Sequence, residues 1–403
     1  MTNPARVLYV HHGSGAGGAA NSLLYLLQCL DADRYEPVVA CNFEAPEARE
    51  YFSKHGFEPL HSSLAPFAHT SKTWDWRTPR GLAKLLRWAC LHHPAARRGI
   101  ARLVRDVRPD LVHLNGVSLL PLAGTIRRCG IPVVQHIRES VNGGQFGLRK
   151  RWLTHLARRR ASHVVYICED GRVRFPVPTD RYSIIYDPVP LDKFRAGDAD
   201  SNKRSLGLPD DCPVLFFPGG SMLDIKGIIP FLRALILVRT EHPTVMALVP
   251  GIDTTPHPRD ECRSQVESII SHEQLESSLC RVPFADDVEQ YYRCSDIVVA
   301  PFVRPHFSRA VIEAGASAKP VVGSRIGGIE EVLEDGTVGL LTNVNDPDDI
   351  ADKLCRLIEN PQLAHSMGQS GYRRSSERFD AVSHARAIME VYDGALGARG
   401  GLK

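Results

Sequence analysis

The chain has 403 residues, of which 43% are hydrophobic and 24% charged, and its net charge is only +3. This length predicts two or three domains at roughly 150 residues each, and the small net charge implies no strongly charged partner. The opening MTNPARVLYVHH has too short an apolar run for a signal peptide, and no stretch approaches the roughly 18 apolar residues of a membrane span. We therefore expect a cytoplasmic protein, one still able to bind a membrane surface from that side.

Short β-rich runs alternate with helical stretches in the first half. RVLYV at 6–10 predicts a buried strand, a glycine-rich turn follows at 13–20, and leucines at helical spacing lead to a second strand, EPVVAC at 36–41. This succession opens a doubly wound parallel sheet. Three further runs predict strands: DLVHL at 110–114, PVVQHI at 132–137 and HVVYIC at 163–168.

The residue pattern changes near residue 187, where YDPVPLDKF is rich in proline. A second series of alternating predicted strands and helices begins after it. Its predicted strands and helices are VLFFPGG at 214–220, IIPFLRALILV at 228–238, TVMALVPG at 244–251, DIVVAPF at 296–302, RAVIEAGA at 309–316 and KPVVGS at 319–324. We predict the α/β class, with two Rossmann-like doubly wound domains facing a cleft. Their expected bounds are 1–190 and 191–380, and a C-terminal helix in 381–403 is expected to pack back on the first domain.

The ten cysteines are scattered and form no C-x-x-C pair, which argues against a zinc ribbon. Several lie in apolar runs, as Cys41 does in VVACNF, so we interpret them as reduced, buried thiols. No metal-binding cluster is visible in the sequence, and we predict no metal site.

The most informative stretch runs from 304 to 341. His306, Phe307 and Ser308 come just before a predicted helix, whose first backbone N–H groups and dipole suit a phosphate. Glu313 lies about one turn inside that helix, and a carboxylate there accepts hydrogen bonds from two neighbouring hydroxyls, as a ribose presents them.

This stretch resembles the signature of retaining glycosyltransferases of the GT-B fold, family four, the glycosyl transferases group 1. The matching positions are Phe307, Glu313, Ala314, Pro320, Val321, Val322, Gly327, Gly328 and Glu331. The resemblance implies that Glu313 binds the donor ribose and that amides from Phe307 to Arg309 bind the diphosphate. Pro305 stands where the family has a Glu that contacts the donor sugar. Three interpretations stay open: a different donor sugar, with Arg304 or His306 substituting for the Glu; a lost or altered activity; or a shifted alignment.

Two further segments resemble the donor side of that family. In GGSMLDIKG, Lys226 matches the lysine that neutralises the departing diphosphate, with Gly219 and Gly220 in the same loop and Ser221 in place of the family's Arg. The segment after 281 resembles the one whose backbone reads the nucleotide base, near Val282 and Phe284.

The first loop has the G-x-G-x-x-G spacing at Gly13, Gly15 and Gly18, a weak signal alone. Gly17 and Gly18 match the family's glycine pair facing the donor phosphates. His12 ends the first strand, where open α/β sheets bind ligands, and is either an acceptor-side group or structural.

QHIRES at 135–140 resembles the family's strand end with a His near the acceptor, which makes His136 the catalytic-region candidate. The leaving phosphate can take the acceptor proton, so His136 is expected to orient groups. Arg138 either binds an anionic acceptor or forms a surface ion pair.

Basic residues mix with Leu and Trp in two stretches, 84–108 and 149–160. Such helices suit an anionic membrane surface, or are simply solvated faces. A lipid-linked or surface-polysaccharide acceptor would fit the first interpretation. No motif indicates nucleic-acid binding.

The leading prediction is a hexosyltransferase that moves a sugar with retention from a UDP- or GDP-linked donor to a hydroxyl acceptor, without a cofactor. A degenerate protein that binds nucleotide sugars without turnover is one alternative. A dinucleotide oxidoreductase is another, although Cys41-Asn42-Phe43-Glu44 is a poor match to its acidic residue after the second strand.

Overall fold

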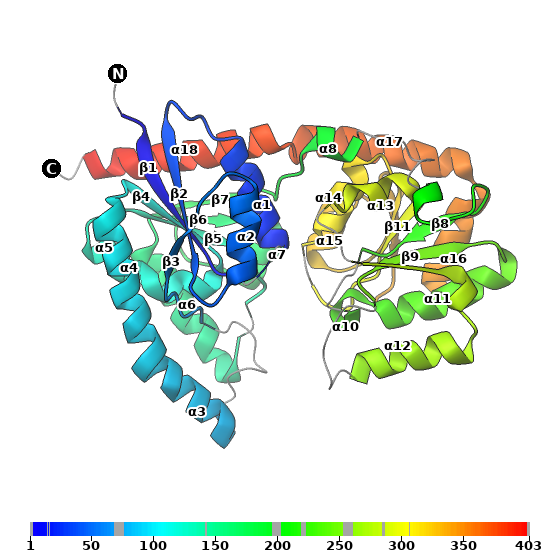
Figure 1. Cartoon of the computed structure of the whole chain (residues 1–403), viewed down its shortest axis with the longest axis horizontal. Helices are drawn as coiled ribbons and strands as arrows, with labels where there is room; N and C mark the ends of the chain where they lie inside the picture. The colour runs from blue at the N-terminus through cyan, green and yellow to red at the C-terminus, as the bar shows by residue number, and fades with distance from the viewer. Residues whose placement is uncertain are drawn as a thin grey trace. The chain divides into compact units, whose positions relative to one another are not determined.

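The computed structural model describes residues 3–13, 15, 17–67, 76–141, 143–195, 203–218, 223–252, 261–283, 287–305 and 307–400. The chain divides into two compact units (Figure 1). The N-unit comprises Met1–Pro188 together with Ala381–Lys403, and the C-unit is Val189–Asp380. The last helix, α18 (Ala381–Gly400), therefore belongs to the N-unit although it follows the C-unit in sequence.

Seven parallel strands form the sheet of the N-unit, in the order β3-β2-β1-β4-β5-β6-β7. They are β1 (Ala5–His11), β2 (Tyr35–Asn42), β3 (Leu60–Ser62), β4 (Leu111–Asn115), β5 (Val133–Ile137), β6 (His163–Tyr166) and β7 (Tyr182–Ile184). The strand order reverses between β1 and β4. That reversal is the switch point of a doubly wound sheet, where such folds bind ligands beyond the carboxyl ends of the strands.

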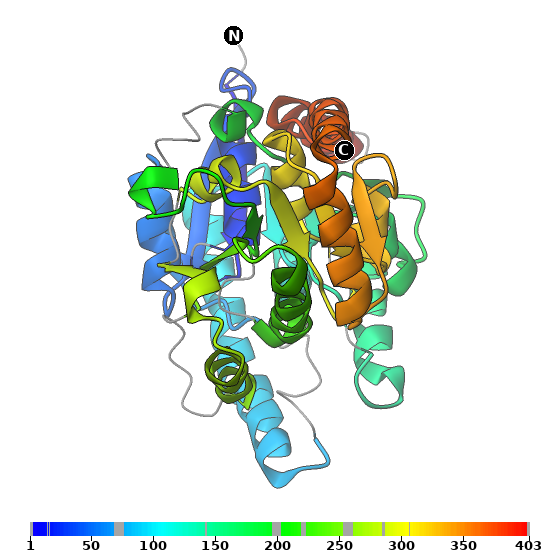
Figure 2. The same cartoon turned by 90° about the vertical axis from the view of Figure 1, so that its right-hand side faces the viewer.

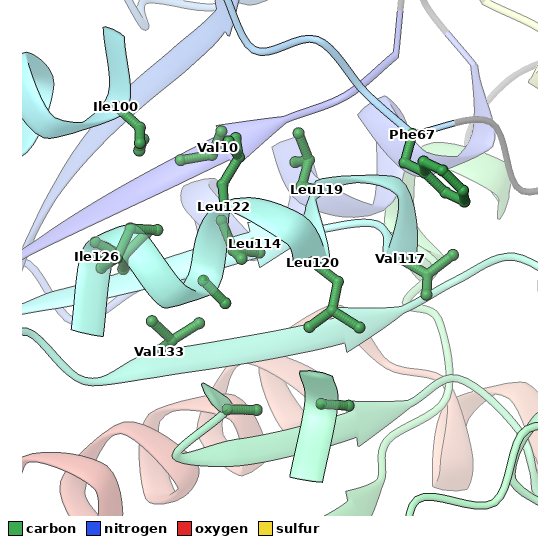
Figure 3. Packing of buried hydrophobic residues seen from close by; sticks show 14 of the residues in the cluster. Val10, Phe67, Ile100, Leu114, Val117, Leu119, Leu120, Leu122, Ile126 and Val133 are labelled. Atoms are coloured by element: carbon green, nitrogen blue, oxygen red, sulfur yellow. The ribbon is translucent and has the colours of Figure 1, made fainter. Parts of the chain in front are cut away.

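Successive side chains of a strand point to opposite faces of its sheet, so alternate residues of β1 pack into two different hydrophobic cores. Val10 packs with strand, α4 and α5 residues on one face of the sheet (Figure 3), whereas Val7 and Tyr9 pack with α1 and α18 on the other. The helices of this unit are α1 (Gly18–Gln28), α2 (Pro46–Lys54), α3 (Pro79–Arg87), α4 (His93–Val107), α5 (Ala123–Arg128), α6 (Leu148–Arg160), α7 (Glu169–Arg174) and α18, with shorter turns η1 (Trp88–His92), η2 (Val117–Leu122) and η3 (Gln145–Gly147).

Six parallel strands form the sheet of the C-unit, in the order β10-β9-β8-β11-β12-β13, with its reversal between β8 and β11. They are β8 (Val214–Phe216), β9 (Met246–Pro250), β10 (Leu279–Val282), β11 (Ile297–Ala300), β12 (Val321–Ser324) and β13 (Gly339–Thr342). The helices around this sheet (Figure 2) are α8 (Leu191–Arg195), α10 (Leu223–Lys226), α11 (Ile228–Glu241), α12 (Glu261–His272), α13 (Glu289–Cys294), α14 (Arg309–Ala316), α15 (Gly327–Val332), α16 (Pro347–Glu359) and α17 (Pro361–Arg378), with η4 (Glu276–Ser278).

The predicted fold class, two Rossmann-like doubly wound α/β sheets, is confirmed. No helix in the described ranges is long and apolar enough to cross a membrane. All ten cysteines are free thiols; burial raises the pKa of Cys41 to about 12 and that of Cys294 to about 11, which makes both poor nucleophiles.

Candidate functional site

Two loops of the C-unit meet at its switch point, one following β8 and the other following β11. Helix α10 belongs to the first, and its Ile225 carbonyl accepts a hydrogen bond of 3.0 Å from the N–H of Val303 in the second. Gly227 has a φ of +79°, and any side chain there would collide with the Pro301 carbonyl. Only glycine fits this close, left-handed position, so the predicted Lys-Gly pair is fixed against the end of β11.

Lys226 ends α10 and lies half-buried at this junction. Burial lowers its pKa below the ordinary value, and the nearby Glu313 carboxylate opposes that shift. Within the described ranges Lys226 forms no ion pair. A partly desolvated ammonium without a partner stabilises negative charge more strongly than a solvated one, which is what a departing diphosphate requires.

Glu313 is buried on α14, and its carboxylate already has two protein partners. One oxygen accepts a hydrogen bond of 2.9 Å from the Tyr292 hydroxyl, and the other accepts one of 3.1 Å from Arg309 Nε within an ion pair. Tyr292 is itself fixed by edge-to-face packing on Phe216 of β8, with ring centroids 4.8 Å apart. A carboxylate has about four acceptor positions, so acceptor capacity remains for a ligand.

Helix α14 begins at Arg309, directly after Phe307 and Ser308. Both of these residues are buried, and the Ser308 hydroxyl has no hydrogen-bond partner among the described residues. A buried hydroxyl with no partner among the described residues, at the start of a helix, is an arrangement that accepts an oxyanion.

The other predicted donor-side residues either lie outside the described residues or have few contacts that bear on a ligand. Gly219, Gly220, Phe284 and His306 lie outside the described residues. Val282 ends β10, and its carbonyl accepts a hydrogen bond of 2.8 Å from the Gly251 N–H. In the N-unit, Gly17 caps α1 and Gly18 begins it; a side chain at Gly17 would meet nothing within 4 Å, so the space beside it is open.

The switch point of the N-unit carries a network of buried polar side chains centred on Asn115. Its amide nitrogen donates to His11 Nδ1 at 3.0 Å and to the Ala19 carbonyl at 3.2 Å, while its amide oxygen accepts from Arg138 Nε at 2.5 Å. One amide therefore ties the ends of three neighbouring strands to the start of α1.

Arg138 follows β5 and is buried, with its guanidinium in an ion pair with buried Asp187. Of the two possibilities left open by the sequence, the surface ion pair is wrong because neither partner reaches the surface. Removing either partner would leave an uncompensated buried charge, which makes the pair a structural requirement whatever else Arg138 binds.

His12 uses both ring nitrogens within the protein. Nδ1 lies 2.5 Å from the Asn115 carbonyl and Nε2 lies 2.8 Å from Glu139. Burial alone would lower the pKa of His12, but the charge and hydrogen bond of Glu139 outweigh it and raise that pKa. A side chain at Gly116, whose φ is +134°, would overlap both groups. His12 therefore has a structural role: it holds the loop that follows β4 in place.

His136 lies on β5 and is fully buried, and burial lowers its pKa well below the ordinary value. Its Nδ1 is 3.2 Å from His113 Nε2 and 3.4 Å from an Arg138 nitrogen, and the latter can only donate. His136 Nδ1 must therefore accept, which places its proton on Nε2. That nitrogen has no partner among the described residues.

Two buried tyrosines adjoin this histidine pair. Tyr392 of α18 contacts His113 Nδ1 at 2.7 Å and the Tyr9 hydroxyl at 3.2 Å. The Tyr392 hydroxyl donates its one proton to Tyr9. A neutral imidazole that donates a hydrogen bond suits the orienting role predicted for His136.

Sequence reasoning missed Tyr292, His113, Asn115 and Tyr392. A signal existed for two of them, because polar His113 and Asn115 interrupt the otherwise apolar run of β4. No sequence signal linked Tyr292 to Glu313 or Tyr392 to His113, since both contacts depend on tertiary packing. Glu241, His242 and Cys355 place donor atoms within 4.8 Å of one another, but none of them belongs to the site described above.

The comparisons with known families cover both units. Residues 17–181 match the glycosyl transferase 4-like domain, and residues 212–360 match the glycosyl transferases group 1. A D-inositol 3-phosphate glycosyltransferase of Catenulispora acidiphila is 29% identical over 226 residues, and that of Thermobifida fusca is 30% identical over 201. These matches cover 54% and 49% of the chain and 51% and 46% of the relatives, so the chain spans about half the length of the curated relatives it matches.

Solved structures with the same fold cover nearly the whole chain. The Anabaena protein HepE, crystallised with UDP and glucose, has a TM-score of 0.79 at 20% identity over 96% of this chain and 99% of its own. Sucrose-phosphate synthase from Thermosynechococcus elongatus has a TM-score of 0.74 at 16% identity, over 98% of this chain and 100% of its own. Each unit therefore matches a glycosyltransferase domain, and the chain has the GT-B fold of these solved structures.

Proposed function

We propose that this protein transfers a hexosyl group from a nucleoside-diphosphate sugar to a hydroxyl acceptor, with retention at the anomeric carbon. The observation that carries the proposal is the half-buried Lys226, which has no ion pair within the described residues, at the same switch point as the first turn of α14. A cation and the N–H groups at the start of a helix together stabilise the charge that develops on a leaving diphosphate. No resident cofactor or metal is needed for that role.

The proposed roles divide between the units. In the C-unit, Lys226 and the amides from Phe307 to Arg309 hold the diphosphate, and Glu313 accepts hydrogen bonds from the ribose with its remaining acceptor positions. In the N-unit, His136 Nε2–H donates to a sugar or acceptor oxygen. The leaving phosphate takes the acceptor proton, so a fully buried histidine with a lowered pKa is compatible with turnover.

We further propose a UDP- or GDP-linked donor and an acceptor of the lipid-linked or surface-polysaccharide type. The first receives support from HepE, whose structure contains UDP, although that likeness shows only the fold. A peripheral position on the cytoplasmic membrane surface would suit a lipid-linked or surface-polysaccharide acceptor. It is supported by α3, on which Gly81 alone is buried and Leu86 is 54% exposed beside Lys84 and Arg87.

Ligand-dependent thermal unfolding tests the donor site. We expect one of UDP or GDP to stabilise the protein by about 2.7 kcal/mol at about 100 times its dissociation constant, whereas NAD should not. Glu313→Gln and Lys226→Ala should each lose most of that stabilisation. Glu359→Gln, which changes an exposed glutamate at the end of α16, serves as the control that retains it.

Turnover separates the transferase from a protein that only binds. With the stabilising nucleotide as its α-linked sugar donor, the sugar first released or transferred should carry the α configuration in a proton NMR time course. Binding without any turnover would favour the degenerate alternative, a β product would overturn retention, and stabilisation by NAD alone would favour an oxidoreductase.

A further inference from the structure

Two helices of the C-unit bring three potential metal ligands together. Glu241 is the last residue of α11, His242 follows it directly, and Cys355 lies on α16, which packs against α11. A ligand atom from each residue lies within 4.8 Å of those from the other two. Helix α11 connects the carboxyl end of β8 to the amino end of β9, so this cluster lies at the opposite edge of the sheet from Lys226.

The imidazole of His242 has a nitrogen for which the described part of the protein supplies no partner. Its Nε2 atom is closed off from solvent and forms no hydrogen bond with any described residue. A carboxylate oxygen of Glu359 lies 3.6 Å from it, which is too long for a hydrogen bond. A buried nitrogen of this kind requires an explanation, and a bound ion would supply the missing partner. The Cys355 side chain beside it is also largely closed to solvent, at 8% exposed.

An acidic cavity of about 690 Å³ opens beside the cluster. Among the described residues that line it, four carboxylates face one guanidinium, that of Arg356. Lys353 pairs with one of the four, Asp352, and an excess of negative charge still remains. The carboxyl end of α11 adds the negative end of the helix dipole at the same place, so the surroundings favour a cation. The four carboxylates are Glu241, Asp348, Asp352 and Glu359.

We propose that Glu241, His242 and Cys355 bind one Zn²⁺ ion, which joins the end of α11 to α16. Thiolate, imidazole and carboxylate are the ligands that zinc takes in proteins, whereas Mg²⁺ and Ca²⁺ prefer oxygen ligands alone. The adjoining cavity gives water access to the fourth position of a tetrahedral ion. The sequence did not indicate this site, because its ligands belong to two helices that are far apart in the chain.

Binding of the ion requires the Cys355 thiol to lose its proton. Burial and the carboxylates of Glu241 and Glu359 raise the pKa of Cys355 to about 11, so the free thiol keeps its proton. The ion therefore displaces that proton to solvent and takes the thiolate as its ligand. Since the ion binds only the folded arrangement of α11 and α16, it should also stabilise the C-unit.

Cobalt and zinc titrations of the metal-free full chain test the site. We expect one Co²⁺ per chain to give the visible bands of a tetrahedral ion and a thiolate charge-transfer band in the near ultraviolet, and Zn²⁺ to abolish both. Cys355→Ser should lose the charge-transfer band. Cys262→Ser, which changes a half-buried cysteine on α12 of the same unit, should keep it.

A second pair of variants keeps the test decisive if Cys355→Ser fails to fold. Glu241 is exposed, so Glu241→Gln should fold, weaken Zn²⁺ binding at least tenfold and lose the rise in thermal midpoint that Zn²⁺ gives the wild type. Glu377→Gln, at an exposed position on α17, should bind Zn²⁺ within twofold of the wild type.

Three results would overturn the proposal: no metal binding by the wild type, a charge-transfer band that persists in Cys355→Ser, or equal zinc affinities in Glu241→Gln and Glu377→Gln. The inference is independent of the proposed function, because these measurements need neither a nucleotide nor turnover.

Discussion

At the end of β4, the side chain of Asn115 uses both N–H donors, on His11 and Ala19, and its oxygen accepts from Arg138. His11, His113 and His136 surround or adjoin this amide, and each is fully buried. Burial lowers the pKa of all three well below the ordinary value, so they are neutral in the folded protein. The hydrogen bonds at this switch point therefore require the three histidines to stay unprotonated.

The stability of the protein should therefore fall on acidification. Below about pH 6.5 the unfolded chain binds protons that these three buried histidines do not, at about 1.4 kcal/mol per pH unit for each. His12 has a raised pKa and acts in the opposite sense, since its contribution is present below about pH 6.5 and lost as the pH rises through its native value. Three histidines with lowered pKa values outweigh one histidine with a raised pKa, so the urea midpoint should be lower at pH 5.5 than at pH 7.5. An unchanged midpoint would contradict the conclusion that these histidines are neutral.

The sequence predicted part of this site because its motifs are local. Lys226 with Gly227, and Phe307 to Glu313, occupy consecutive positions, so a loop or a helix turn already fixes their order. The partners that orient them are distant in sequence. Tyr292 reaches Glu313 from another helix, and Asp187 reaches Arg138 from 49 residues away, contacts that no periodicity encodes.

Among the elements, the long strands were predicted within a residue or two, as for β1 and β2, since their apolar runs mark them clearly. The edge strands β3 and β7 were missed: each has three residues and mixes polar with apolar side chains. Helix α3 stands out among the helices because so little of it is buried. It has nine residues, only one of them buried, and such a short helix is marginal in water without a partner surface.

We expect that partner to be an anionic bilayer. Leu82→Gln with Leu86→Gln should reduce co-sedimentation with phosphatidylserine-containing vesicles about tenfold, because both side chains are exposed and flanked by cations. Leu237→Gln serves as the control, since this leucine on α11 of the C-unit is 39% exposed against 42% for Leu82. Raised salt should weaken wild-type binding; equal loss in the control, or no wild-type binding, would show that α3 is a solvated helix.

At the scale of the whole molecule, the C-unit is an insertion into the N-unit. Its two ends lie side by side: the Val189 N–H donates to the Phe379 carbonyl at 2.8 Å, and Val189 bridges Asp380. Helix α18 then completes the N-unit, with Ile388 and Tyr392 fully buried against the sheet face that carries Val7 and Tyr9.

Residues 1–188 produced alone should fail to fold, since that apolar face would lose its cover. Joining residue 188 to residue 381 through a short Gly-Ser linker should restore a cooperative urea transition, because it replaces an insertion whose ends are adjacent. Circular dichroism and sedimentation of the two proteins check this. A stable, monomeric 1–188 fragment would show that α18 is dispensable to the N-unit.

The same connectivity sets the order in which the protein can be completed during synthesis. The first strand of the N-unit leaves the ribosome early, but the helix that covers one face of its sheet emerges last. At about 5–20 residues per second, translating the C-unit alone takes roughly 10 to 40 s. Throughout that interval the face around Tyr9 and Val134 has no cover from α18. The nascent chain is therefore expected to need a chaperone until α18 has been synthesised, while the C-unit can already have folded.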